Sequence, residues 1–215
     1  MPYTIIFKFA SNISHIFPII FGRRTKPILW WYTVMCLFFD LGTFLLKKSN
    51  LHVPGIENTF LIVEFCLISV FYRQLYRVNA TYYATFAIGI LLFLIHTIFI
   101  RPYNTSIPFD VFRVNLSAGA IFYLYYIIYS IAGFYKQIKE PEQDFIEHSS
   151  FFWVNVAFLV YASGVFFIFL FAQIIEVQDY NMISLLWNYL FCSLNIIKNI
   201  FLAKALAVDN GSVKR

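Results

Sequence analysis

Apolar residues fill seven long stretches of the chain, and short breaks with charged residues or proline separate them. Each stretch is close to the roughly 20 residues that a helix needs to cross a hydrocarbon core. The stretches are apolar on all sides instead of alternating, so the strands of a membrane barrel are not expected. The pattern predicts helices over residues 3–21, 27–46, 57–76, 81–100, 109–135, 151–175 and 182–208.

The composition agrees with a membrane protein. Of 215 residues, 60% are hydrophobic and 13% are charged, a balance that a water-soluble domain does not carry on its surface. We predict an all-α, polytopic integral membrane protein, with one seven-helix transmembrane domain over 1–208 and a short cytoplasmic tail over 209–215. Polar residues interrupt the first stretch, so an interfacial helix is the alternative for 3–21.

Basic residues predict the orientation, because cytoplasmic loops are enriched in Lys and Arg. Ten basic residues flank the helices on one side and four on the other, which predicts an external amino terminus and a cytoplasmic carboxyl terminus. The net charge of +5 then reflects membrane topology, and no nucleic-acid partner is expected. The inner set is Arg23, Arg24, Lys26, Arg73, Arg77, Lys136, Lys139, Lys204, Lys214 and Arg215; the outer set is Lys47, Lys48, Arg101 and Arg113.

Ionisable residues inside membrane helices are candidate functional residues, because a charge at the helix centre costs about 2.5–3.5 kcal/mol. At about 1.5 Å of rise per residue, five polar residues on five helices are expected in the outer third of the membrane, roughly 6–10 Å deep. We interpret them as an outer ligand-binding pocket: Asp40, Glu64, His96, Asn115 and Asn188. Two acids at one depth favour protonation of one of them or a bound cation. Hydrogen bonding between helices is the alternative role.

A second polar group is expected in the inner half of the membrane. Lys198 is predicted roughly 24 Å below the outer face. That depth is too great for an ion pair with Glu64, so its ammonium is expected to extend toward the inner headgroups. Polar residues spaced by three or four along 184–199 form a stripe that faces protein. We expect the inner group to couple helix movements: Asn155, Ser163, Gly164, Asn195, Lys198 and Asn199.

The sequence lacks the residue patterns that several kinds of catalytic and cofactor site require. The four histidines lie on different segments, so the paired histidines of zinc-dependent membrane hydrolases are missing, and no metal site is expected. No GxSxG, HExxH, P-loop or GxGxxG motif occurs. Lys198 also lacks the counter-ion pattern of a retinal-binding lysine. The sequence identifies no catalytic residue and no cofactor.

Four stretches carry a resemblance to a known family: "DLGTFLL" (40–46), "ENTFLIVEFCLISVFYRQLY" (57–76), "FFWVNVAFLVYASGVFFIFLF" (151–171) and "NYLFCSLNIIKNIFLAKAL" (188–206). They resemble the seven-helix membrane sensor region that precedes the kinase module in sensor histidine kinases of the Bacteroidota. The resemblance implies a multi-pass protein of a bacterial inner membrane. The matching positions include Glu64, Asn155, Tyr161, Ser163, Gly164, Asn195, Lys198 and Asn199. After Val208 the sequence reads "DNGSVKR", with no phosphoacceptor histidine or ATP-binding domain, so kinase activity is not expected.

The expected function is that of a free-standing membrane sensor or receptor-like module. A small apolar or amphipathic ligand, or a change in proton activity, would act at the outer pocket, and a cytoplasmic or membrane signalling protein would receive the signal. A membrane enzyme that uses Asp40 and Glu64 as general acid and base on lipid is one alternative. A small proton-coupled transporter is another, although such proteins usually show repeated halves and we find no repeat.

Overall fold

The computed structural model describes residues 2–22, 27–48, 54–76, 80–99, 116–139, 146–175, 182 and 185–212. Throughout these residues the fold is all-α, as the sequence predicts. The elements are α1 (Pro2–Ser14), α2 (Ile16–Gly22), α3 (Pro27–Lys48), α4 (Pro54–Tyr76), α5 (Ala80–Phe99), α6 (Leu116–Lys139), the short 3₁₀ helix η1 (Ile146–His148), α7 (Ser150–Ile175), the π-helix η2 (Leu186–Phe191) and α9 (Cys192–Ser212). The expected helix over 109–135 corresponds to α6, and its first residues, 109–115, lie outside the described part.

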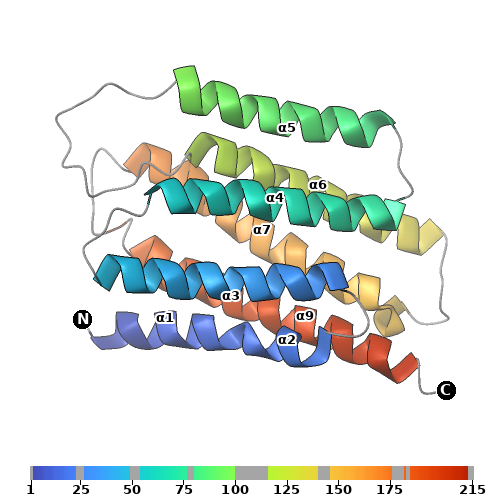
Figure 1. Cartoon of the computed structure of the whole chain (residues 1–215). Coiled ribbons are helices and arrows are strands. Elements are labelled where there is room, and N and C mark those ends of the chain that lie inside the picture. Colours follow the sequence, from blue (N-terminus) through green and yellow to red (C-terminus); the bar gives the residue numbers. More distant parts are fainter. Residues whose placement is uncertain are drawn as a thin grey trace.

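The helices form a bundle in which they lie side by side and successive long helices run in opposite directions (Figure 1). As a result, α1 begins at one end of the bundle and α9 finishes at the other (Figure 1). α9 packs against α1, α2 and α7, and α7 packs in turn against α6. α3 packs against α4, and α5 lies at the edge against α4 and α6. α7 and α9 therefore form the centre of the bundle, next to every part of the polar core described below.

Three helical stretches within the described residues are long and apolar enough to cross a membrane, by length and composition. They are Pro27–Leu46 in α3, Ser150–Ala172 in α7, and Leu186–Val208 across η2 and α9. Ile5–Phe21 and Tyr83–Ile95 are shorter apolar helices.

The first predicted helix is divided at His15 into α1 and α2. Pro18 explains the break, because proline lacks the N–H that would bond to the carbonyl of Ser14 four residues earlier. Around the break the backbone bonds are long: the His15 N–H donates to the Asn12 carbonyl at 3.4 Å, and the Ile19 N–H donates to the His15 carbonyl at 3.4 Å. The break allows the His15 side chain to be buried against α9, where it is 1% exposed.

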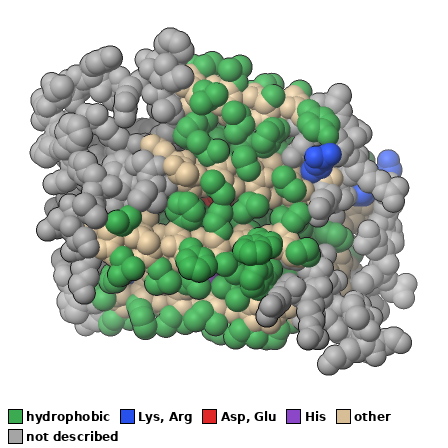
Figure 2. Space-filling model, viewed as in Figure 1, with side chains coloured by type: hydrophobic (Ala, Val, Ile, Leu, Met, Phe, Trp, Pro, Cys, Tyr) green, Lys and Arg blue, Asp and Glu red, His purple; other side chains and the backbone are tan. Residues whose placement is uncertain are grey.

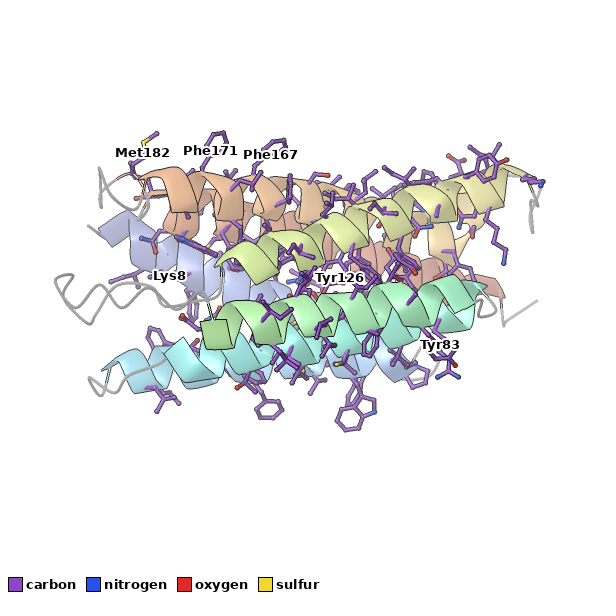
Figure 3. The ribbon with its side chains drawn as sticks, turned by 90° about the horizontal axis from the view of Figure 1, so that it is seen from above. Lys8, Tyr83, Tyr126, Phe167, Phe171 and Met182 are labelled. Atoms are coloured by element: carbon purple, nitrogen blue, oxygen red, sulfur yellow. The ribbon has the colours of Figure 1, made fainter. Side chains whose placement is uncertain are left out.

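The surface of the bundle is more apolar than that of a water-soluble protein. Large apolar side chains such as Phe38 (71% exposed) and Ile20 (69% exposed) cover the perimeter. In Figure 2 apolar side chains spread over the middle of the visible face, whereas Lys and Arg lie near one end. Phe167, Phe171 and Met182 point away from the bundle, and Tyr126 lies within it (Figure 3). The interior combines a hydrophobic core, rich in aromatic side chains, with a smaller set of buried polar side chains, which provide the setting for the candidate site.

Candidate functional site

Glu64, in the middle of α4, is a buried carboxylate with two hydrogen-bond donors. Its side chain is 1% exposed. The Tyr32 hydroxyl on α3 donates to Oε1 at 3.0 Å, and the Tyr123 hydroxyl on α6 donates to Oε2 at 2.9 Å. Both carboxylate oxygens thus act as acceptors, so the carboxyl group satisfies its hydrogen bonds inside an apolar bundle.

Lys198 on α9 reaches the same place from the other side. Its side chain is also 1% exposed, and its Nζ donates to the Tyr32 hydroxyl at 3.0 Å. Nζ lies 4.3 Å from the ring centroid of Tyr161 on α7 and 5.1 Å from that of Tyr32, within the range of cation–π attraction. We call Tyr32, Glu64, Tyr123, Tyr161 and Lys198 the central network.

The central network corrects the prediction for Lys198. Its ammonium does not extend to the inner headgroups, and a single hydroxyl separates it from Glu64. The predicted helix begins at residue 57, whereas α4 begins at Pro54. Three more residues before Glu64 place it about 4.5 Å further from the outer end of the helix than predicted. The long lysine side chain and the Tyr32 hydroxyl span the remaining distance. Direct contact is indeed absent, because the described residues include no Lys198–Glu64 ion pair within 4.0 Å.

The central network is sensitive to its charge state. It contains one amine and one carboxyl group, which the Tyr32 hydroxyl connects. Removing one partner of a buried ion pair leaves the other charge uncompensated, at a cost of about 3–5 kcal/mol. Because α3, α4, α6, α7 and α9 each contribute a side chain, such a change affects the packing of five helices at once.

A second polar cluster surrounds His15, between the α1–α2 break, α3 and α9. His15 Nε2 lies 3.1 Å from Asp40 Oδ2 and Nδ1 lies 3.2 Å from Asn199 Nδ2. Asn195 Nδ2 lies 3.1 Å from His15 Nε2 and donates to Ser11 Oγ at 2.9 Å, while Asn199 Nδ2 donates to Ser14 Oγ at 2.7 Å. We call these residues the His15 cluster: Ser11, Ser14, His15, Asp40, Asn195 and Asn199.

The five residues of the predicted outer pocket do not form one group. Asp40 belongs to the His15 cluster and Glu64 to the central network, and the described residues give the two carboxyl groups no shared hydrogen-bond partner. Asn188 lies half-buried in η2. The side chain of His96 and all of Asn115 fall outside the described part. Helix depth alone places residues at one level without saying which helices face each other, so it did not separate the His15 cluster from the central network.

The inner group is also divided. Asn195 and Asn199 bind His15, so they lie with Asp40 instead of forming a separate inner layer. Asn155 on α7 is fully buried, and its amide has no hydrogen-bond partner within the described structure. Gly164 is half-buried where α7 meets Leu194 on α9, and Ser163 beside it is half-buried too.

The functional candidates that the sequence did not identify are Tyr32, Tyr123 and His15. Tyr32 lies four residues before Cys36, on the polar stripe of α3 that also includes Thr33 and Asp40, so helical phase could have found it. The role of Tyr123 had no signal, because α6 is rich in tyrosine on several faces. The described residues contain no group of three or more His, Cys, Asp or Glu side chains that could hold a metal ion.

Comparisons with known proteins add no relative. No protein-family model, no curated protein and no solved structure matches the chain.

Proposed function

We propose that this chain is a seven-helix sensor of a bacterial inner membrane, with its amino terminus outside, which passes a stimulus to a separate signalling protein. The crossings would be α1–α2, α3, α4, α5, α6, α7 and η2–α9. In this proposal the central network is the element with two states. A stimulus that changes its charge or hydrogen bonding changes the packing of α9 against its neighbours.

Support for the membrane location comes from the distribution of side chains. The perimeter carries many large apolar side chains, while Glu64 and Lys198 are buried inside, as expected when lipid surrounds a bundle. Arg73 in the last turn of α4 and Lys136 and Lys139 in the last turn of α6 lie at the end of the bundle that we assign to the cytoplasm.

The observation that carries the sensor proposal is the hydrogen-bonded chain from Lys198 through Tyr32 to Glu64. Intramembrane ionisable groups are expensive and commonly functional. Buried ionisable groups that compensate each other contribute little to stability compared with apolar packing, and we take their presence here to favour a role in switching between arrangements. α9 carries Lys198 and continues from there to the proposed cytoplasmic end, where a partner would detect its movement.

A proton-coupled carrier is the second candidate. The same buried ammonium and carboxylate favour it, because carriers use such groups to bind and release protons. The lipid-acting enzyme is not proposed further, since its general acid and base would be Asp40 and Glu64, whose carboxyl groups bind different partners.

The test compares helix distances in variants of the central network. Spin labels at Lys139→Cys on α6 and Ala207→Cys on α9, both at exposed positions, report the cytoplasmic ends in lipid nanodiscs, with the native cysteines replaced. We expect Glu64→Gln and Lys198→Met each to change the α6–α9 distance distribution. The double variant should return it toward that of the wild type, because neither charge is then unpaired. Glu147→Gln, at an exposed position on η1, is the matched control and should have no effect.

Two outcomes would contradict the sensor proposal. Identical distributions in the wild type and both single variants would leave the central network as structural packing. Proton uptake into liposomes containing the wild type, absent with Glu64→Gln, would identify the carrier instead.

A further inference from the structure

We propose that His15 is the proton-binding site of this sensor, and that acidification outside the cell is the stimulus it detects. In this inference, which rests on the proposed sensor function, a proton added to the His15 ring breaks the hydrogen bond between the ring and Asn199. The α1–α2 segment is thereby released from α9.

The protonation of the ring follows from its neighbours. A neutral imidazole has one N–H and one lone pair. Asp40 Oδ2, an acceptor, lies 3.1 Å from Nε2, whereas Asn199 Nδ2, a donor, lies 3.2 Å from Nδ1. A hydrogen on Nε2 donates to Asp40 and leaves the Nδ1 lone pair to accept from Asn199, whereas a hydrogen on Nδ1 would satisfy neither. Asn195 Nδ2, also 3.1 Å from Nε2, then donates to Ser11 Oγ and not to the ring. This arrangement satisfies both ring nitrogens in the neutral form only.

A second proton, taken from the aqueous phase, has to occupy Nδ1. The Nδ1–H and the Asn199 amide N–H would then face each other, and two donors cannot bond. Rotating the Asn199 amide would present Oδ1, which is buried with no hydrogen-bond partner within the described structure. That rotation takes Nδ2 away from Ser14 Oγ, to which it donates at 2.7 Å. Either way, a hydrogen bond between α9 and the α1–α2 break is lost.

Charged and titratable groups around His15 come from each helix packed against it. Burial of the ring disfavours the imidazolium most strongly. Lys198 on α9 also opposes it, and Asp40 on α3 favours it. Cys192 lies on α9, two turns before Asn199, and Lys8 lies two turns before His15 on α1. Asp40 is therefore the neighbour that favours a proton on the ring.

Access to protons is provided by Asp40. Its side chain is 32% exposed, while that of His15 is 1% exposed. Within the cluster the other side chains are all buried: Ser11, Ser14, Asn195 and Asn199. Asp40 lies eight residues from the proposed outer end of α3, about 12 Å, and thirteen from the inner end, about 20 Å. The shorter path leads to the outside.

The sequence of α9 connects this site to the central network. Asn199, which binds His15, directly follows Lys198, which binds Tyr32. Movement of α9 on release from His15 therefore also displaces the Lys198 ammonium from the Tyr32 hydroxyl.

The test is a titration of the full chain, labelled with ¹⁵N-histidine, in lipid nanodiscs from about pH 8 to pH 5. We expect the His15 ring nitrogens to shift to imidazolium values. Spin labels at Ile20→Cys on α2 and Ala207→Cys on α9 should report a longer distance over the same pH interval. His15→Gln should abolish the change in distance, and His148→Gln, which removes an exposed histidine on η1, should retain it. Asn199→Ala should retain the titration but lose most of the change in distance.

The inference is overturned if the His15 ring stays neutral down to pH 5, or if it titrates without any change in the α2–α9 distance. If His15→Gln does not fold, the titration of the chain with its native His15 still decides this. Variants that lack His52, His96 or His148 then assign the remaining ring signal to His15. Failure here is distinguishable from failure of the sensor proposal, which is measured between α6 and α9 with Glu64 and Lys198 variants at constant pH. A response there without titration of His15 means a sensor with another stimulus.

Discussion

Tyr32 is the residue on which the central network depends, because its hydroxyl accepts from Lys198 and donates to Glu64. Tyr32→Phe keeps the ring and removes both bonds. We expect the variant to lose about 1.5–3 kcal/mol of stability, the range for hydrogen bonds to charged groups. Thermal unfolding in detergent, followed by the fraction that remains monodisperse, measures the loss.

Two further tyrosines provide graded controls for that experiment. Tyr123→Phe removes one bond to Glu64 and should cost less than Tyr32→Phe. Tyr135→Phe, at a position that is 68% exposed, should leave stability unchanged. Equal losses for Tyr32→Phe and Tyr135→Phe would mean that the central network contributes nothing to folding.

For single residues, the sequence predicts which polar side chains are buried better than it predicts their hydrogen-bond partners. It identified polar groups that belong inside: Asp40, Glu64, Asn195 and Asn199. All but the partly exposed Asp40 are buried. Lys198, whose ammonium was expected near the headgroups, is buried as well. Their partners depend on which helix faces which, and that arrangement is set by side-chain packing that a hydropathy pattern does not contain. The pairing of Asp40 with His15 instead of Glu64 is the clearest instance.

At the scale of elements, the contact between α7 and α9 depends on Gly164. A methyl group there would overlap the side chain of Leu194. Gly164→Ala should therefore destabilise the protein by about 1–3 kcal/mol, the usual cost of overpacking. Leu194→Ala in the same chain should recover part of that loss by making room. Differential scanning fluorimetry of the single and double variants measures both effects.

Gly42 on α3 is the matched control, since a methyl group there would meet no atom within 4 Å. Gly42→Ala should be neutral or stabilising by up to about 1 kcal/mol, because alanine favours the helix. A loss equal to that of Gly164→Ala would show that the close approach of α7 to α9 does not determine the result.

The sequence predicts where the helices lie better than it predicts their ends and internal irregularities. Long apolar runs identify a helix whatever it packs against, so the described parts of all seven expected segments are helical. Their ends depend on capping and on loop contacts, which is why α4 begins three residues before the predicted start. The division at His15 had a signal in Pro18, but the π-helical turn of η2 had none that we recognise.

At the scale of the whole molecule, the number of membrane crossings decides how every site is reached. Within the part of the chain that the structure describes, three stretches satisfy a strict criterion of length and apolarity, in α3, α7 and η2–α9. If only those cross, everything between α3 and α7 lies on one side, including Lys48 at the end of α3 and Lys139 at the end of α6. Seven crossings place Lys48 outside and Lys139 inside. The two arrangements therefore differ at a pair of positions that chemistry can label.

Single cysteines at Lys48 and Lys139, in a chain without native cysteines, test this in intact cells with a membrane-impermeant maleimide. We expect Lys48→Cys to react from outside, and Lys139→Cys to react only after permeabilisation. Reaction of both from the same side would reduce the crossings to an arrangement such as α3, α7 and η2–α9. α4 and α6 would then lie outside the bilayer, and Glu64 would be an ordinary buried acid. The charge compensation between Lys198 and Glu64 would then no longer imply a membrane switch, because water near the bundle would screen both groups.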